Sequence, residues 1–253
     1  MEPKLSDKAI VRPVKNSRTP RLGPVAALVG TKTDFEGVRR RVATPTTRPR
    51  ALFAGHLLIT DANQGQFAVA GPLMGAPAAV MFLETLVAWG ARKLLYFGWC
   101  GAIAPHVHSG DIIVPTGAII DEGTSLHYHA GLNQVAAPSL EIRTAIRQTL
   151  RAHAQPFHDG PVWTTDALFR ETPAKVAFYQ QQGALGVEME TSALFTAANF
   201  HHVAMGCVLV VSDELSTMTW QPGFKDERFK RSRAVIGDLI PLICKRLSPE
   251  TPE

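Results

Sequence analysis

Two carboxylates flank a thioether at Glu188-Met189-Glu190, where a strand-like stretch meets residues 191–199, which have the composition of a helix. Acids at the start of a helix are favoured by the helix dipole. A carboxylate can accept hydrogen bonds from neighbouring hydroxyls, and a flexible apolar side chain packs against the apolar face of a ring. The pattern therefore predicts a sugar-binding site with Glu190 and Met189 as ligands. Glu188 is expected to be either a third ligand or a buried support.

A further acid, Asp213, follows a β-branched run at residues 203–211 that predicts a buried strand. Ligands in α/β folds bind at the carboxyl ends of such strands, so Asp213 is expected to belong to the same site. It could act as a general acid, or it could cap a following helix, a position that aspartate also favours. Ser212 lies in no Gly-x-Ser-x-Gly motif, so we expect it to support the turn at Asp213 rather than act as a nucleophile.

Strand-like and helical segments alternate along the chain, which predicts a single α/β domain with a mixed central sheet flanked by helices. The 253 residues, 45% of them hydrophobic, suffice for one large core. We expect a flexible basic segment at 1–22 and a catalytic domain at 23–248. Strands are predicted at 24–30, 51–60, 67–70, 93–97, 112–120 and 203–211, with a turn at 61–65, and helices at 78–91, 139–154, 173–182, 190–199 and 228–247.

The bulk composition excludes several kinds of partner. The net charge is +4, and much of the basic excess lies before residue 51, but no platform of aromatic residues is interleaved with it. A solvated surface is therefore favoured over a nucleic-acid partner. The longest apolar stretch, residues 76–89, is interrupted by Pro77 and Glu84 and is too short to cross a membrane. The sequence also opens without the apolar segment of a secretory signal.

The cysteines and histidines predict neither disulfides nor a metal site. The three cysteines are odd in number and far apart, a pattern typical of a reduced, cytoplasmic protein. The paired histidines at 106 and 108, and at 127 and 129, lack a third ligand at a recognisable spacing. We therefore expect no metal.

Several glycine-rich and acidic motifs follow one another between about residues 24 and 245. They are Gly30 after the first strand, Gly71-Pro-Leu-Met-Gly75, Gly98-Trp-Cys-Gly101, Gly110-Asp111, Asp121 to His127, Thr165-Asp166-Ala-Leu-Phe169 and the Glu188 to Glu190 segment. In order and spacing the chain resembles the superfamily of nucleoside phosphorylases and nucleosidases, which includes purine nucleoside phosphorylase, uridine phosphorylase and methylthioadenosine nucleosidase.

The resemblance implies an enzyme of nucleoside metabolism or salvage that cleaves the N-glycosidic bond between a base and its sugar. It implies that Glu190 binds the ribose hydroxyls and that Asp213 helps the base leave. It places Leu168 and Phe169 over the base, although ordinary core packing would also explain these two residues. It implies no cofactor, and a homo-oligomer, either a dimer or a trimer of dimers.

Three positions depart from the phosphorylases of this family. Where those enzymes bind phosphate with two arginines and a serine or threonine, this chain has Asp34, Tyr96 and Trp99. Phosphate recognition depends on arginine forks and free N–H donors, so an acid and two aromatics oppose it. The nucleosidases place an acid at or next to the position of Asp34, where it activates water. Hydrolysis with Asp34 as the base is therefore favoured, and Tyr96 and Trp99 are expected to contact the substrate.

Two alternatives remain open at this point. A phosphorylase could retain a rearranged phosphate site built from other cations, for which the candidates are Lys32, Arg39, Arg40 and Arg170. A binding protein could hold a nucleoside without turning it over. The sequence does not identify the base.

Overall fold

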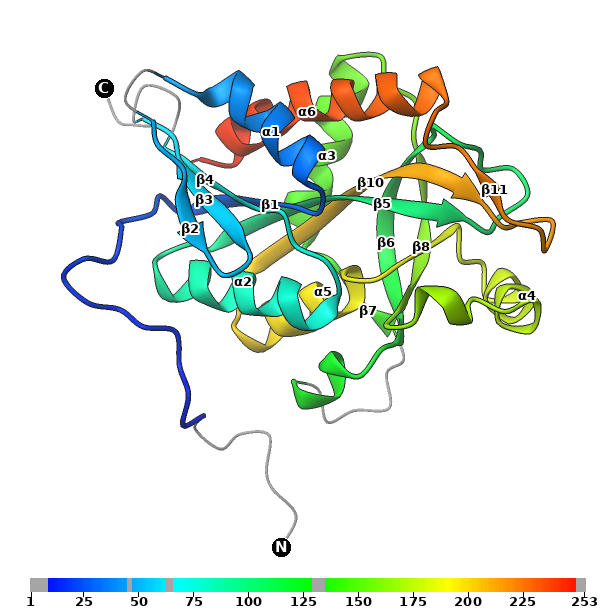
Figure 1. Cartoon of the computed structure of the whole chain (residues 1–253), viewed down its shortest axis with the longest axis horizontal. Coiled ribbons are helices and arrows are strands. Elements are labelled where there is room, and N and C mark those ends of the chain that lie inside the picture. The colour runs from blue at the N-terminus through cyan, green and yellow to red at the C-terminus, as the bar shows by residue number, and fades with distance from the viewer. Residues whose placement is uncertain (1–8, 45–46, 62–65, 129–134, 249–253) are drawn as a thin grey trace, which may run out of the picture.

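The computed structural model describes residues 9–44, 47–61, 66–128 and 135–248. They form an 11-stranded mixed sheet with helices on both faces (Figure 1). The strands are β1 (Val25–Val29), β2 (Arg50–Leu52), β3 (Gly55–Ile59), β4 (Phe67–Gly71), β5 (Lys93–Ala102), β6 (Ile112–Asp121), β7 (Val135–Ala136), β8 (His158–Thr165), β9 (Gly186–Glu188), β10 (Ala204–Glu214) and β11 (Gln221–Pro222). The helices are α1 (Lys32–Val42), α2 (Ala76–Ala88), α3 (Leu140–Ala152), α4 (Pro173–Gln181), α5 (Thr191–Phe200) and α6 (Glu227–Leu247), with 3-10 turns η2 (Thr124–His127) and η3 (Leu168–Arg170).

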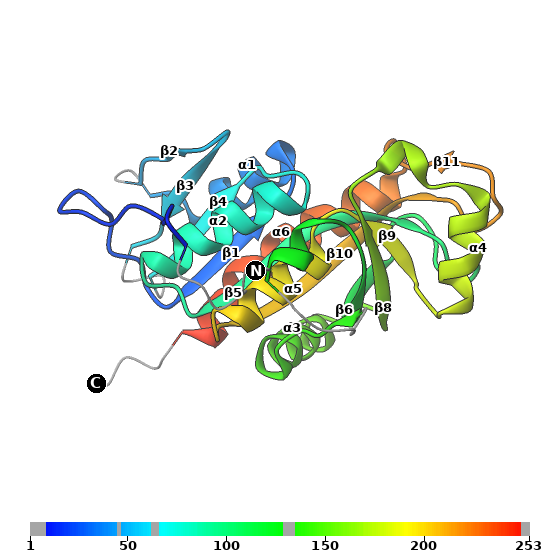
Figure 2. The same cartoon turned by 90° about the horizontal axis from the view of Figure 1, so that it is seen from below.

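Side-chain alternation along the strands builds a separate apolar core on each face of the sheet. In β1, Ala26 and Leu28 pack into the core beneath α2 and α5, whereas Val25, Ala27 and Val29 pack into the core beneath α1, α3 and α6. Figure 1 shows α1 and α6 above the sheet and α2 and α5 below it, and Figure 2 gives the view from below. Both faces of the central strands are therefore dry, which explains why their sequences are almost continuously apolar.

The sheet closes on itself at one end. β10 pairs with both β5 and β6, β6 pairs with β8, β8 pairs with β9, and β9 returns to β5. β1, β5 and β10 run parallel, so their carboxyl ends meet at one edge. In this register Asp213 lies opposite Gly101. The closed strands thus bring together motifs that are far apart in the sequence.

The structure differs from the predicted elements at several points. Residues 51–60 form two strands joined by a turn, and α1 and β8 were not predicted. α1 was missed because the basic run that begins at Arg39 obscures an apolar face formed by Phe35, Val38 and Val42. β10 continues through Asp213 and is followed by β11, so helix capping by Asp213 is wrong. Most of the predicted turn at 61–65, and residues 1–8 of the predicted N-terminal segment, lie outside the described residues.

None of the helices in the described part of the chain is long and apolar enough to span a membrane.

Candidate active site

A cavity of about 510 Å³ opens at the carboxyl ends of β1, β5, β9 and β10. This volume is in the range of small-molecule sites. Eight residues predicted from the sequence line it, namely Tyr96, Trp99, Leu168, Phe169, Glu188, Met189, Glu190 and Asp213. The structure therefore gathers one acid-rich segment, parts of two strands, β5 and β10, and one apolar turn around a common space.

Glu190 is a buried residue of the cavity lining and directly precedes α5. Its Oε1 accepts a hydrogen bond from the backbone N–H of Gly75 at 2.6 Å, and its Oε2 accepts one from the Tyr96 hydroxyl at 2.9 Å. Burial raises the pKa of Glu190, while these two bonds oppose the rise. Each carboxylate oxygen can accept a second bond, so both remain available to a ligand hydroxyl.

Glu188 points its carboxylate into the fold and anchors the start of α5. Its Oε2 accepts bonds from the N–H groups of Glu190 and Thr191 at 2.8 and 2.7 Å and from the Thr191 hydroxyl at 2.7 Å, and its Oε1 accepts one from Thr164. Burial, followed by the charge of Glu190, raises the pKa of Glu188 to about 7, against the lowering effect of the hydroxyl bonds. With four bonds already made, Glu188 is better suited to hold Glu190 in place than to bind a ligand.

Asp213 lines the same cavity from β10, at an irregularity of the strand. Its Oδ1 lies 2.5 Å from the Ser212 hydroxyl, and its Oδ2 accepts a bond from the Trp220 indole N–H at 2.8 Å. The serine is thus a neighbour that orients the acid, which agrees with the supporting role expected for it. Trp220 follows no recognisable motif, and sequence reasoning missed it.

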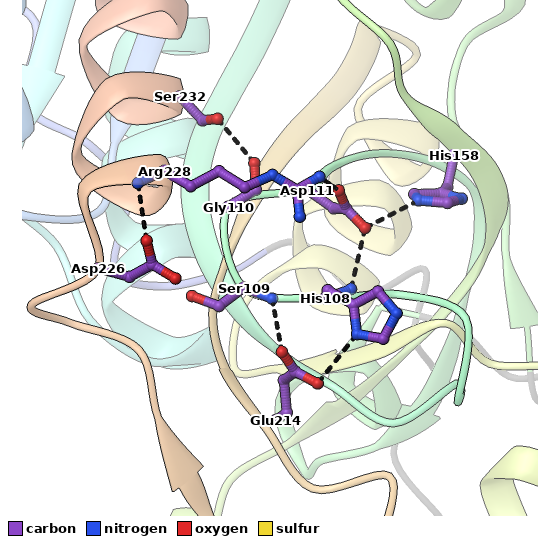
Figure 3. Close-up of polar contacts among 9 residues, drawn as sticks. All are labelled: His108, Ser109, Gly110, Asp111, His158, Glu214, Asp226, Arg228 and Ser232. Carbon is purple, nitrogen blue, oxygen red and sulfur yellow. Dashed lines mark hydrogen bonds and ion pairs between the residues drawn. The ribbon is translucent and has the colours of Figure 1, made fainter.

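A polar network surrounds Glu214 at the end of β10 (Figure 3). Glu214 accepts a bond from the backbone N–H of Ser109 at 2.9 Å and contacts Nδ1 of His108 at 3.2 Å. Asp111, in the same loop, pairs with His158 at 3.1 Å and with Arg228 at the start of α6. Within the described residues, no cluster of three or more histidine, cysteine or acidic side chains is arranged to hold a metal. The bonds to Glu214 tie this loop to the end of the strand that carries Asp213.

Apolar side chains form the open wall of the cavity. Leu168 and Phe169 lie on η3, and they are 50% and 96% exposed. Their exposure is incompatible with the core-packing alternative. Trp220 and Phe224 line the same space and are also exposed. Four such side chains could cover the flat face of a base.

Asp34 does not line the cavity. Its Oδ1 accepts two bonds from the Arg233 guanidinium at 3.0 and 2.8 Å, and its Oδ2 accepts bonds from the Trp99 indole at 2.6 Å and the Thr31 hydroxyl at 2.7 Å. The guanidinium also lies 4.4 Å from the centre of the Trp99 ring. This buried cluster aligns Trp99 against the cavity. Arg233 could not be identified from the sequence, because 199 residues separate it from Asp34.

Tyr96 fills the space that two glycines leave free. A Cβ atom at Gly30 would lie 2.8 Å from the Tyr96 hydroxyl oxygen, and one at Gly98 would lie 2.6 Å from the same oxygen. Of the described residues that line the cavity, none is lysine, arginine or histidine. Lys32 lines an adjoining groove that shares Gly30 with the cavity. Tyr96, which stands where the resemblance implies a phosphate-binding arginine, thus fills this space with an aromatic ring.

Asp34→Asn is expected to lower the free energy of unfolding by about 3–5 kcal/mol, because it leaves the Arg233 charge buried and unpaired. The Arg233 side chain is 13% exposed, so water can compensate little. Urea unfolding measures the loss. The double variant Asp34→Asn/Arg233→Met should recover much of it, since both charges are then removed. A loss below about 0.5 kcal/mol would mean that the pair behaves as a surface salt bridge.

Comparison with known proteins agrees with this architecture. The family model described as "Phosphorylase superfamily" matches residues 24–240. A guanosine phosphorylase of Halorubrum lacusprofundi is 29% identical over 56% of this chain and 58% of its own length, and a DeoD-type purine nucleoside phosphorylase of Shewanella baltica is 27% identical over 60% of this chain and 65% of its own. The aligned part of the chain thus spans less than two thirds of these relatives.

Solved structures extend the similarity in fold to almost the whole chain. A uridine phosphorylase of Vibrio fischeri superimposes with a TM-score of 0.75 at 21% identity, covering 90% of this chain and 92% of its own. The predicted fold, a mixed sheet flanked by helices, is confirmed. Because the family model covers nearly all of the folded region, from β1 into α6, the chain belongs to the phosphorylase superfamily.

Proposed function

We propose that this protein cleaves the N-glycosidic bond of a nucleoside and transfers the sugar to water. The observation that carries the proposal is the cavity itself, which is lined by two acids, Glu190 and Asp213, and has no cationic side chain among its described lining residues. The relatives named above are phosphorylases, which supports the proposal that the N-glycosidic bond is the bond that is cleaved.

The two acids suit the two halves of this reaction. Departure of the base leaves a cation-like sugar, so the base must receive a proton and the sugar must be held. Asp213, oriented by Ser212 and Trp220, delivers the proton. Glu190 accepts bonds from the ribose hydroxyls, and its negative charge stabilises the positive charge that develops on the ring. Met189 packs beneath the sugar, and the exposed Phe169 closes over the base.

Water is favoured over phosphate as the acceptor of the sugar because Tyr96 lies beside an acid, Glu190. A phosphate dianion entering there would meet the buried Glu190 carboxylate and an aromatic ring, and no cation of the described cavity lining would offset the repulsion. Asp34 does not reach the cavity, so its role in our proposal is to position Trp99 and not to activate water. A cation-like sugar reacts readily with water, and the protonated hydroxyl that forms loses its proton to solvent, from which Asp213 regains its own, so a strong base at this point is not required.

Phosphorolysis is the second candidate, and the names of the relatives favour it. In that case Lys32, in the groove that adjoins the cavity at Gly30 and Thr31, is the described cation best placed to bind phosphate. A protein that binds nucleosides without turnover is the third candidate. We also propose that the chain forms a homo-oligomer, as the resemblance implies.

A panel of ribonucleosides in phosphate-free buffer tests the proposal. Each reaction is followed by release of the base and by appearance of free reducing sugar. Hydrolysis predicts equal amounts of both products for at least one nucleoside. Base release that appears when phosphate is added, and not before, would favour the phosphorylase. Ligand-induced thermal stabilisation without any base release would favour the third candidate, a protein that binds nucleosides without turnover.

A further inference from the structure

Glu171 is an acid in the cavity that neither the sugar site nor proton delivery explains. It directly follows η3, it is partly buried, and it lines the cavity together with Asp213. Within the described part of the chain its carboxylate makes no hydrogen bond or ion pair. Polar groups in protected positions normally have partners. An acid that faces a cavity without a partner is therefore available to a ligand.

The fold brings Glu171 close to Asp213. α4, which begins two residues after Glu171, is tied to the segment after β10, because the Gln180 side chain donates a hydrogen bond to the carbonyl oxygen of Ser216 at 3.1 Å. Figures 1 and 2 both place α4 and β11 at the same end of the molecule. Burial, and then the charge of Asp213, raises the pKa of Glu171 to about 7, as expected for two carboxyl groups at one end of a cavity.

The chemistry of a purine leaving group indicates which atoms of the base Asp213 and Glu171 would contact. A purine departs most easily when its N7 is protonated, so the general acid, Asp213, must face N7. The exocyclic substituent at position 6 projects next to N7 on the same edge of the ring. A second acid beside Asp213 therefore reaches that substituent. An ionised carboxylate can only accept hydrogen bonds, so it binds an amine there and repels a keto oxygen.

On the basis of the function proposed above, we propose that Glu171 selects nucleosides of 6-aminopurines over those of 6-oxopurines by accepting a hydrogen bond from the exocyclic amine. Sequence reasoning had no signal for this role, because Glu171 follows the Leu168-Phe169 turn without a motif of its own. The open wall formed by Phe169 and Trp220 would stack on either kind of purine, so it cannot supply this discrimination.

Binding of free bases tests Glu171 separately from catalysis. Adenine and hypoxanthine are titrated at about pH 8, where a carboxyl group with a pKa of about 7 is mostly ionised, and binding is followed by the fluorescence of Trp99 and Trp220. The unmodified protein should bind adenine at least about tenfold more tightly than hypoxanthine. In Glu171→Gln the preference should fall to about threefold or less, because an amide both accepts and donates. Glu171→Ala should lose it as well.

Glu141→Gln on α3 is the matched control, since this glutamate is half exposed and lies outside the cavity lining. It should keep the preference of the unmodified protein. An unchanged preference in Glu171→Gln, or a preference of the unmodified protein for hypoxanthine, would overturn the role of Glu171. Adenosine and inosine are then tested for cleavage. If neither these nor other nucleosides are cleaved, the proposed reaction fails, while the base affinities still decide the role of Glu171.

Discussion

Asp213→Asn is expected to lower kcat on the best nucleoside substrate by about 10²–10⁴-fold, the usual contribution of a general acid. An asparagine of the same shape keeps the carbonyl that accepts the Trp220 bond but has no acidic proton to give to the base. Base release under saturating substrate measures kcat, and quenching of tryptophan fluorescence measures whether ligand still binds. Binding should persist while turnover is lost.

Asp238→Asn is the matched control for this experiment. Asp238 lies on α6, pairs with Arg41, and its side chain is 60% exposed. Its loss should leave kcat unchanged. If Asp213→Asn also retained full activity, the acid would be a structural residue of the strand end, like its neighbour Glu214.

Glu190→Gln is expected to lower kcat/KM for ribonucleosides by about 10–100-fold, because a hydrogen bond to a charged group is worth about 1.5–3 kcal/mol. The amide has one acceptor oxygen, so it cannot accept from both Gly75 and Tyr96 and still bind two sugar hydroxyls. Steady-state rates on a ribonucleoside and on its 2′-deoxy counterpart measure the effect. The loss should be smaller for the deoxynucleoside, which lacks one of the hydroxyls.

Tyr96→Phe separates sugar binding by Glu190 from its local support. This change removes the hydroxyl that holds Oε2 but leaves the carboxylate, so its effect should be clearly smaller than that of Glu190→Gln. Equal losses on the two sugars in Glu190→Gln would show that this acid does not contact the 2′-hydroxyl. Equal losses in the two variants would show that the Tyr96 hydroxyl, and not the charge, carries the effect.

The sequence was sufficient for the fold class, because its central strands are buried on both faces and its glycines mark strand ends. The β-branched run before Asp213 and the acid pair at Glu188 and Glu190 each predicted a local element correctly. The extension of β5 through Gly98 to Ala102 was not predicted, because it depends on pairing with β10 and β9 and not on local propensity.

The tertiary partners were beyond local reasoning for the same physical reason. Asp34 stands in the first turn of α1, and only the folded chain brings Arg233 from α6 to neutralise it. Glu171 likewise acquires its significance from α4, which holds it near the end of β10. Spacing along one segment can identify an acid as a candidate, but the charges that decide its role come from segments far away in the sequence.

The dependence of cleavage on phosphate tests the central claim most directly. The best nucleoside is incubated with the unmodified protein, first after enzymatic removal of phosphate and then with added phosphate, and the sugar product is identified by phosphorus nuclear magnetic resonance and a reducing-sugar assay. We predict the same rate in both conditions and free ribose as the product, because Tyr96 stands in place of an arginine expected in the phosphorylases and the described lining of the cavity offers no cation. A rate that falls to background without phosphate, with ribose 1-phosphate as the product, would contradict the account and would direct attention to Lys32 as the phosphate ligand.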